Sequence, residues 1–163
     1  MNAVSESTKS SIDRVRAALA AAGHPDTITE FPAGTKTAAD AAAAVGCTVA
    51  QIAKSIVFRA EGRAVVVITS GSNRVDQKKV EAALNVPIKR ADADFVRATT
   101  GFAIGGVSPV GHINPPLLLF DQDLLTLSPI YAAAGSHSHV FLTEPQTLQR
   151  LTGALVADVR VEW

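Results

Sequence analysis

The chain has 163 residues, of which 47% are hydrophobic and 18% are charged. This balance is typical of one globular domain with a substantial core, and it excludes a disordered chain. Lysine plus arginine and aspartate plus glutamate each total 15, so a polyanion would have to bind a local patch. The single cysteine, Cys47, excludes an internal disulfide and a cysteine-rich metal site.

Membrane and secretion signals are also missing from the sequence. No apolar run approaches the ~20 residues that span a bilayer, and residues 1–11 lack the apolar centre of a signal peptide. We therefore expect a cytoplasmic protein without a membrane partner, forming a single domain over residues 1–163 with residues 1–9 flexible.

The first predicted elements are two helices with a short strand between them. Ser10 or Ser11 can cap a helix that Gly23 ends. Residues 27–31 are expected to form a short strand, and residues 32–34 break it. Thr37 then precedes an alanine-rich helix over residues 38–45, which Gly46 ends. The first helix has an apolar stripe made of Ile12, Val15, Leu19 and Ala22.

A hairpin is predicted in the middle of the chain. Thr48 opens a short helical turn over residues 49–53, and the apolar runs 56–58 and 64–69 flank Glu61-Gly62, which indicates two antiparallel strands. Lys54 is expected where the helical turn passes into the first strand. It is either a surface charge whose stem packs on apolar groups, or an ammonium directed into a cleft at the sheet end. In a cleft it could orient a phosphate, a ribose hydroxyl or a carbonyl oxygen.

Two more helices and a buried strand follow the hairpin. A helix over residues 75–84 places Val80 and Leu84 inward and two lysines, Lys78 and Lys79, outward. The lysines form either a solvated face or a small basic patch for an RNA backbone. A helix is expected over residues 92–99, and residues 117–120 form a buried strand.

Residues 105–112 read Gly-Gly-Val-Ser-Pro-Val-Gly-His and fit neither a helix nor a strand. Glycine allows close backbone approaches, and Pro109 stiffens the turn. A rigid loop of this kind suits a ligand whose carbonyl or phosphate lies against backbone N–H groups. The alternative is a tight connection between strands that binds no ligand.

The C-terminal part is predicted to contain strands and one helix. Residues 130–136 form a strand that enters a glycine turn, and residues 140–142 form the next strand. Thr143 is the expected N-cap of a helix over residues 146–151 that ends near Gly153, and residues 156–161 form a last strand. The short apolar runs predict an α+β fold, with a mixed, mostly antiparallel sheet curled toward a barrel and helices around it.

Acidic and histidine side chains leave a metal site open as an alternative. Asp121 and Asp123 occupy a turn, where aspartate is common without any metal. His137 and His139 follow the glycine turn, but no histidine pair at helical i,i+4 spacing supports a metal site. We therefore expect no metal and no cofactor.

Three segments, in this order, resemble the YbaK/ProX family. They are Ala53-Lys54-Ser55 entering a strand, Gly105-x-x-x-Pro109 followed by Gly111-His112, and Ala134-Gly135-Ser136 before a terminal strand and helix. This family contains aminoacyl-tRNA deacylases that act in trans and are related to the editing domain of bacterial prolyl-tRNA synthetases. The resemblance covers about residues 12–161 and implies hydrolysis of the ester between a wrongly attached amino acid and the terminal adenosine of tRNA.

The resemblance also implies the residues of the site. Lys54 matches the family's essential lysine, and Gly105 opens the motif whose backbone positions the ester and a nucleophilic water or ribose hydroxyl; both are expected to be catalytic. His112 either donates to the substrate or braces the loop, and His137 and His139 each either shape the pocket or are exposed turn residues. The expected substrate-binding residues are Ser55, Gly106, Ser108, Pro109, Gly111, His112, Gly135, Ser136 and His137.

The predicted partner is the acceptor end of an aminoacyl-tRNA. Alanine on proline tRNA is the first expectation for the substrate, and the neutral net charge favours delivery by prolyl-tRNA synthetase or an elongation factor. A homodimer is left open. Two alternatives remain, namely a module that binds an aminoacyl-nucleotide or another small ligand without turnover, and a metal-dependent hydrolase built on the histidines and Asp121.

Overall fold

The computed structural model describes residues 6–31 and 37–162. The helices are α1 (Glu6–Ala21), α2 (Ala38–Val45), α3 (Gln77–Leu84), α4 (Ala93–Thr100) and α5 (Pro145–Thr152), with short 3-10 helices η1 (Val49–Gln51) and η2 (Gln122–Thr126). The strands are β1 (Ile28–Glu30), β2 (Ile52–Ala60), β3 (Arg63–Ser70), β4 (Lys89–Arg90), β5 (Leu117–Asp121), β6 (Ile130–Ser136), β7 (His139–Thr143) and β8 (Leu155–Ala157). No helix among these is long and apolar enough to cross a bilayer.

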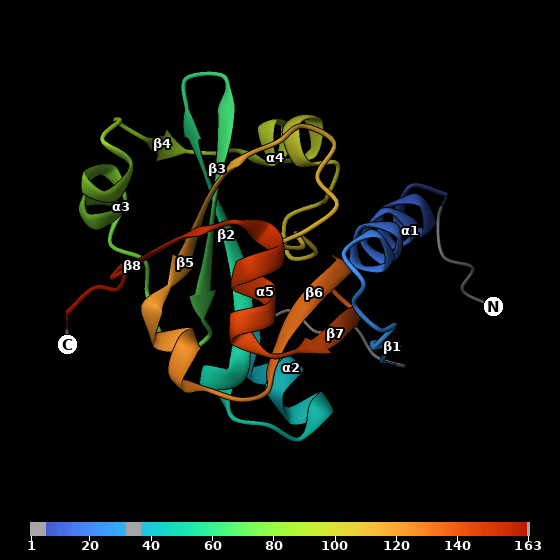
Figure 1. Ribbon diagram of the computed structural model, residues 1–163. Coiled ribbons are helices and arrows are strands. Elements are labelled where there is room, and N and C mark those ends of the chain that lie inside the picture. Colours follow the sequence, from blue (N-terminus) through green and yellow to red (C-terminus); the bar gives the residue numbers. More distant parts are fainter. Residues whose placement is uncertain (1–5, 32–36, 163) are drawn as a thin grey trace.

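One mixed sheet organises the fold, as the sequence predicted. Its strands follow the order β1-β7-β6-β2-β3-β5-β8, and β4 pairs with β2 outside this path. The pairs β1/β7, β2/β3, β2/β4 and β6/β7 are antiparallel, whereas β2/β6, β3/β5 and β5/β8 are parallel. The sheet is twisted but stays open, so it is not a barrel (Figure 1).

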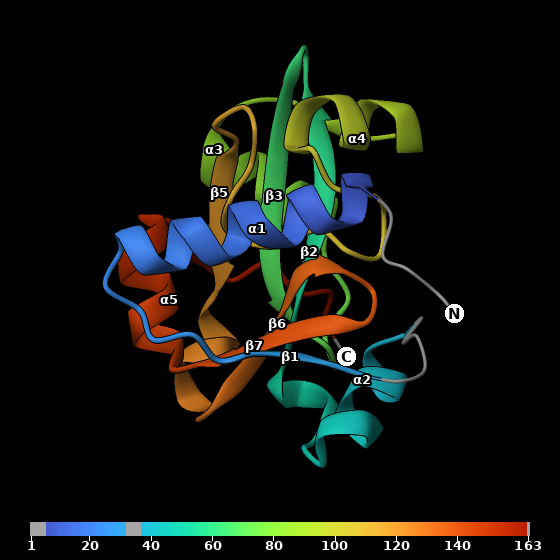
Figure 2. The ribbon, with the colours of Figure 1, turned by 90° about the vertical axis from the view of Figure 1, so that its right-hand side faces the viewer.

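Helices cover both faces of the sheet (Figures 1 and 2). Helix α1 lies across one face, where Val15 and Leu19 pack into the larger core cluster. Helix α3 covers the other face, where Val80 packs in a second cluster with residues of β2, β3 and β5. Since β-strand side chains alternate between faces, successive residues of β2 contribute to different clusters. Because of this alternation, neighbouring residues of β2 such as Lys54 and Ser55 point to opposite faces of the sheet.

Strand β2 has one continuously paired edge and one divided edge. It pairs with β3 along residues 53–60. On the other edge, β6 pairs with Ile52 and Ala53, and β4 pairs with Phe58 and Arg59. Among the described strands, none pairs with residues 54–57 on this second edge. The sheet therefore opens beside the segment that contains Lys54.

Local signals explain several element boundaries. Helix α2 has the predicted bounds because Thr37 and Asp40 form a capping box and Gly46 ends the helix in the left-handed conformation with a φ of 77°. Helix α1 begins at Glu6, so residues 6–9 are helical where the sequence indicated flexibility, and residues 1–5 lie outside the described chain. Ala22 follows the helix and is exposed, so it does not belong to the apolar stripe.

Other boundaries differ from the predictions. The N-cap of α5 is Glu144, and the Thr143 hydroxyl instead lies 2.9 Å from Nε2 of His24. Strand β8 covers residues 155–157, so only residues 156 and 157 of the expected strand 156–161 belong to it. The predicted break at residues 32–34 lies outside the described residues.

The predicted basic face of α3 is partly neutralised. The ammonium of Lys79 lies 2.8 Å from Oδ2 of Asp158 and 2.6 Å from Oε1 of Glu162. Both acidic partners come from the C-terminal segment, about 80 residues away in the sequence, so the pairing could not be predicted from sequence spacing. Lys79 therefore helps to attach that segment to α3, which weakens the hypothesis of an RNA-binding patch there.

Candidate active site

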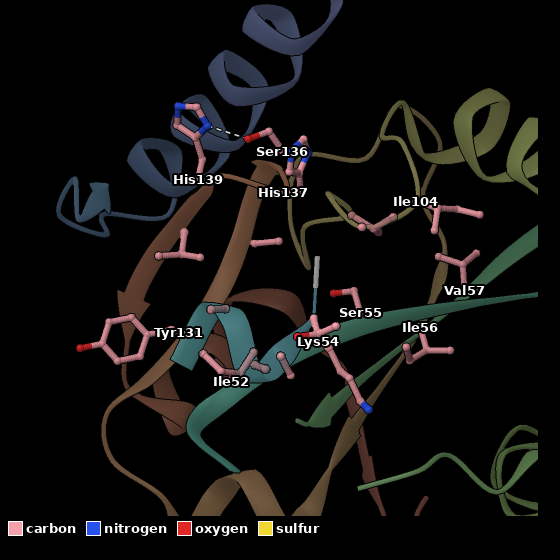
Figure 3. A pocket seen from close by; sticks show the side chains of 18 of the residues that line it. Ile52, Lys54, Ser55, Ile56, Val57, Ile104, Tyr131, Ser136, His137 and His139 are labelled. Carbon is pink, nitrogen blue, oxygen red and sulfur yellow. Dashed lines mark hydrogen bonds between the residues drawn. The ribbon is translucent and has the colours of Figure 1, made fainter. Parts of the chain in front are cut away.

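A cavity of about 390 Å³ lies at the divided edge of β2. Its walls come from residues 52–57 of β2, from α2, from the Gly105 loop and from the turn between β6 and β7 (Figure 3). Most lining side chains are small or apolar, and the polar ones gather at β2 and at the β6–β7 turn. Of the predicted site residues, Lys54, Ser55, Gly105, Ser136 and His137 line this cavity.

Lys54 and Ser55 reach the cavity from opposite faces of β2. Ser55 points toward the β6–β7 turn, whereas the Lys54 side chain runs to the other side of the strand (Figure 3). Both border the cavity because β2 has no neighbouring strand there. The sequence indicated that Lys54 lies at the start of this strand, where the helical turn ends. In the structure it is the third residue of β2.

The Lys54 ammonium is partly buried. Burial lowers the pKa of the Lys54 ammonium, and the negative charge of Asp121 opposes this by raising it. An ammonium placed in this way can hold a phosphate or a carbonyl oxygen more strongly than one in bulk water, because less solvent screens it.

Ser55 has a hydroxyl with unused hydrogen-bonding capacity. Its Oγ is buried and has no hydrogen-bond partner among the described residues. A buried hydroxyl without a partner costs about 1–3 kcal/mol. Because Ser55 lines the cavity, a ligand with a donor or acceptor at this point would relieve that cost.

The Gly105 loop contacts the β6–β7 turn directly. Gly105 has a φ of 90° and open space where a Cβ would lie. A Cβ on Gly106 would lie 2.8 Å from the Cα of Ser136, so only glycine allows this approach. Gly106 donates its N–H to the carbonyl of Ala103 at 3.0 Å, which makes it part of the turn.

The remaining loop residues lie behind the cavity wall. Ser108, Pro109, Gly111 and His112 do not line the cavity, although the sequence indicated that they bind substrate. Ser108 is fully buried, and its Oγ accepts the N–H of Val110 at 3.3 Å. Gly111 has a φ of 82° and packs on the backbone of α1. The contacts of Ser108 and Gly111 support the loop, and bracing the loop was one of the two roles considered for His112.

His112 is the most perturbed titratable group of the loop. Its ring packs edge-to-face on Phe102 with 5.7 Å between the ring centroids. Burial lowers the pKa of His112 to about 4, while the Ser108 backbone raises it and the Arg14 charge lowers it. Its Nε2 is buried without a partner among the described residues. His112 is therefore neutral at pH 7.

Arg14 of α1 holds the segment from Gly101 to Gly111, a role that was not predicted from the sequence. Its Nη2 donates to the carbonyl of Gly101 at 2.7 Å, and its Nε donates to the carbonyl of Gly111 at 3.1 Å. Its guanidinium also lies over the ring of Phe102, 5.0 Å from the centroid. No motif marks this arginine, since its partners are 87 and 97 residues away.

The β6–β7 turn contributes hydroxyl and imidazole groups. Gly135 has a φ of 103° and packs on the backbone of Ser11, so it supports the turn and does not line the cavity. The hydroxyl of Ser136 lies 2.6 Å from Nδ1 of His139. Burial lowers the pKa of His139, and Glu30, whose carboxylate is 3.7 Å from Nε2, opposes this. His139 and Tyr131 also line the cavity, a placement that strand alternation could have indicated.

The acidic pair of the predicted turn lies in a separate polar network. Asp121 and Asp123 each accept a hydrogen bond from Nδ2 of Asn73 at 2.8 Å. Within residues 6–31 and 37–162, no group of three histidine, cysteine, aspartate or glutamate residues could hold a metal ion. The alternative of a metal-dependent hydrolase therefore lacks a ligand cluster in this part of the chain.

Relatives of known sequence carry the same domain. The model of the aminoacyl-tRNA editing domain matches residues 32–151. The uncharacterized protein YwhH of Bacillus subtilis is 29% identical over 138 residues, which cover 83% of this chain and 88% of YwhH. Proline–tRNA ligase of Bacillus licheniformis is 34% identical over 103 residues, which cover 63% of this chain but only 18% of the ligase.

Solved structures show the same fold over almost the entire chain. A crystal structure described as a candidate trans-editing enzyme for prolyl tRNA synthetase is 42% identical, with a TM-score of 0.88 and coverage of 98% of this chain and 100% of the other. The hypothetical protein APE2540 is 28% identical, with a TM-score of 0.84 and coverage of 91% and 99%. With the editing-domain match over residues 32–151, these similarities show that the chain belongs to the aminoacyl-tRNA editing domain family, in its YbaK-like branch.

Proposed function

We propose that this protein acts in trans as a metal-independent deacylase that removes a small amino acid, alanine first, from mischarged proline tRNA. The observation that carries the proposal is that Lys54 and Gly105 border one cavity at the divided edge of β2. A lysine and a glycine loop that allows close backbone approach thereby border the same cavity, in a protein of the editing family.

The reaction needs stabilisation of developing negative charge on the ester carbonyl. Water, activated by a hydroxyl of the terminal ribose, adds to the acyl carbon, and the bond between that carbon and the ribose oxygen then breaks. The ribose oxygen takes up the proton, and the products are a free amino acid and uncharged tRNA. In this proposal the Gly105 backbone and the Lys54 ammonium stabilise the oxyanion and hold the terminal nucleotide, a role that suits fixed dipoles and charges because they need no reorganisation.

The cavity favours a small acyl group. Ala38, Ala41 and Ala133 line it together with aliphatic side chains, so its walls offer apolar surface to a short side chain. Ser55 and His137 are polar groups that can orient the α-amine. Discrimination against a side chain that differs by one methylene is worth only about 1–3 kcal/mol, so we expect a preference rather than an absolute choice.

Delivery by a partner fits the overall charge. Since acidic and basic residues balance, the acceptor end must be held by local contacts, and prolyl-tRNA synthetase or an elongation factor can supply the rest of the affinity. We accordingly place the protein in the cytoplasm, where charged tRNA is found.

The decisive experiment measures deacylation of a panel of mischarged tRNAs under single-turnover conditions, with and without a chelator. The panel carries alanine, serine, threonine and cysteine on proline tRNA. We expect the alanyl ester to be hydrolysed fastest and the chelator to have no effect. Lys54→Ala is expected to lose about 10²–10³-fold in rate, the loss typical of removing one oxyanion-stabilising group.

Lys78→Ala is the matched control, because Lys78 is an exposed lysine of α3 outside the cavity. It should keep the wild-type rate. Absence of hydrolysis across the panel, with protein in excess over tRNA, would overturn the proposal and favour a binding module without turnover. Loss of activity with chelator, restored by a divalent metal, would overturn metal independence alone.

A further inference from the structure

A row of polar side chains crosses three strands on the face opposite Ser55. Lys54 on β2 is paired in register with Thr69 on β3. Ile68 pairs with Phe120 on β5, so Thr69 lies beside Asp121, one residue further along. Oγ1 of Thr69 donates to Oδ2 of Asp121 at 2.7 Å, which shows that both side chains share one face.

The neighbouring rows on this face are entirely apolar. The next row contains Ile56, Val67 and Leu119, and the row after it contains Phe58, Val65 and Leu117. All six belong to or pack against the core cluster beneath α3. Lys54, Thr69 and Asp121 thus form the polar end of a buried surface, and Asp121 is only 1% exposed.

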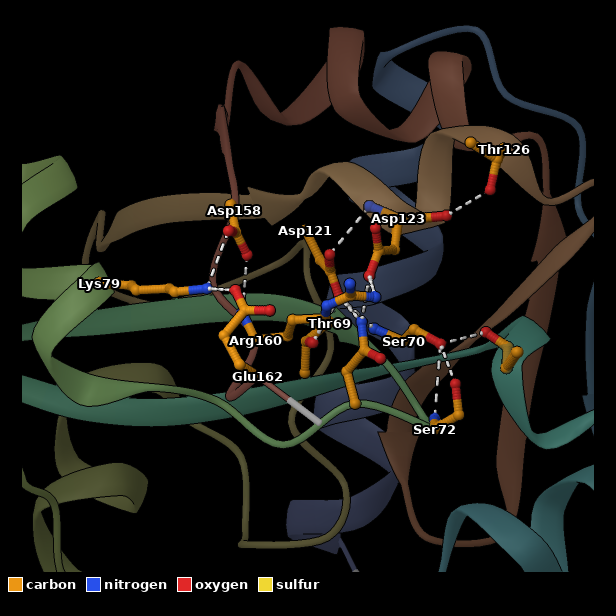
Figure 4. A network of polar contacts seen from close by, with 12 residues as sticks. Thr69, Ser70, Ser72, Lys79, Asp121, Asp123, Thr126, Asp158, Arg160 and Glu162 are labelled. Atoms are coloured by element: carbon orange, nitrogen blue, oxygen red, sulfur yellow. Dashed lines mark hydrogen bonds and ion pairs between the residues drawn. The ribbon is translucent and has the colours of Figure 1, made fainter.

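The carboxylate of Asp121 is fixed by hydrogen bonds on both oxygens (Figure 4). Oδ2 accepts from the Thr69 hydroxyl, from the backbone N–H of Ser70 at 3.1 Å and from Nδ2 of Asn73 at 2.8 Å. Oδ1 accepts the N–H of Asp123 at 2.9 Å. These four donors hold the carboxylate in one orientation. The deacylation scheme above gives this buried charge no role.

Lys54 lies two strands away from this carboxylate on the same face of the sheet, with Thr69 between them. Two strand spacings separate their backbones by roughly 10 Å, and the lysine side chain extends on that face. Of the other charged groups nearby, Asp123 is paired with Arg160 at 3.1 Å, and His137 and His139 face the cavity. Burial lowers the pKa of Lys54, and the charge of Asp121 opposes this by raising it.

We propose that Asp121 is a positioning residue of the editing site, whose buried and hydrogen-bonded carboxylate directs the Lys54 side chain along the β2–β3–β5 row. This inference rests on the proposed function for its catalytic meaning, but the pairing itself is a property of the unliganded protein. It assigns to the acidic turn a role other than metal binding.

The test follows the titration of both groups by nuclear magnetic resonance in the full chain, labelled with ¹³C in lysine and aspartate. Lys54→Ala and Asp121→Asn assign the two resonances. In the wild type, the Asp121 Cγ resonance should shift through the pH range in which Lys54 loses its proton. In Asp121→Asn, Lys54 should lose its proton at lower pH, because an opposing charge has been removed.

Asp123→Asn is the matched control, since Asp123 belongs to the same network but pairs with Arg160. It should leave the titration of Lys54 unchanged. In deacylation assays, the alkaline limb of the rate profile should move to lower pH in Asp121→Asn, with about a tenfold lower rate where wild-type Lys54 is still protonated. This readout separates positioning from a merely structural role.

The experiments distinguish a failure of the inference about Asp121 from a failure of the proposed deacylase function. If wild type and variants all fail to deacylate, the function fails, while the titrations still report on the pair. If Lys54 titrates identically in a folded Asp121→Asn, the inference is overturned. If that variant does not fold, the wild-type titration decides, and an Asp121 Cγ resonance that stays constant while Lys54 deprotonates overturns it.

Discussion

The cavity beside β2 and the network at the end of β5 both contain buried polar groups. The groups of the network are hydrogen-bonded within the protein, whereas one group at the cavity has no such partner. In the network, both oxygens of Asp121 are occupied by donors from the protein. At the cavity, Oγ of Ser55 is buried and has no partner among the described residues. A group that is satisfied within the fold stabilises it, whereas an unsatisfied one costs stability until a ligand arrives. The difference separates structural polar groups from candidate binding groups.

His112 extends this comparison, because its Nε2 is unpartnered but lies behind the cavity wall. Its pKa is about 4 in the folded protein, against 6.5 for an ordinary histidine. Between pH 6.5 and about 4 the unfolded chain binds a proton at this histidine and the folded chain does not. The contribution of this group to the free energy of unfolding should therefore fall by about 3 kcal/mol as the pH is lowered from 6.5 to about 4, and it should stay constant above pH 6.5.

Urea denaturation of wild type and His112→Leu across the same pH range measures this effect. Other groups titrate in both proteins, so the difference between the two isolates His112. His112→Leu should lose less stability on acidification. Equal pH dependence in the two proteins would show that the ring takes up its proton without unfolding.

Gly106→Ala tests the contact that forms the cavity wall. The added methyl would lie 2.8 Å from the Cα of Ser136, so backbone must move and the loop must shift. Misplacing catalytic groups by about 1 Å can cost about 10²-fold in rate, and we expect a loss of this size in single-turnover deacylation. Gly62→Ala, at the β2–β3 turn with nothing within 4 Å of the new methyl, should keep the wild-type rate. Equal rates in both variants would refute the role of the contact.

Asn73→Ala breaks the satisfied network. Its Nδ2 bridges the carboxylates of Asp121 and Asp123, and removing it leaves buried acceptors with fewer donors. The free energy of unfolding should fall by about 2 kcal/mol. Chemical denaturation checks this, with Gln122→Ala, an exposed neighbour, as the control. A loss below that of Gln122→Ala would mean that Asn73 is dispensable.

Ser55→Ala should have the smallest effect on stability and the opposite sign. Removing an unpartnered buried hydroxyl should raise the free energy of unfolding by up to about 1 kcal/mol, while deacylation becomes slower because the ligand loses a partner. Thermal melting and single-turnover rates measured on the same sample decide this. If both stability and rate fall, Ser55 has a partner within the protein and the comparison with the network does not hold.

Local chemistry explains which elements were predictable from the sequence. The bounds of α2 follow from Thr37, Asp40 and Gly46, which act within ten residues of one another. The β2–β3 hairpin follows from two apolar runs around Glu61-Gly62. Alternation and capping are short-range, so a single sequence contains enough information to place these elements.

The site was only partly predictable, because its geometry depends on long-range pairing. The sequence marked Lys54, Ser55, Gly105, Ser136 and His137, and all of them line the cavity. It did not show that β6 and β4 leave part of the β2 edge open, since both strands pair with β2 from distant positions. Nor did it show that Ser108, Pro109, Gly111 and His112 lie outside the cavity lining, because that depends on contacts such as the packing of Gly111 on α1.

Helix α1 has a consequence for how this domain can be cut or transplanted. The editing-domain match begins at residue 32, yet Arg14 clamps the carbonyls of Gly101 and Gly111, and the backbone around Ser11 fills the space beside Gly135. A fragment that begins at residue 32 would lack α1, which contacts both the Gly101–Gly111 segment and the turn at Gly135. The segment that the editing-domain model matches is thus shorter than the segment that holds both glycine loops in place.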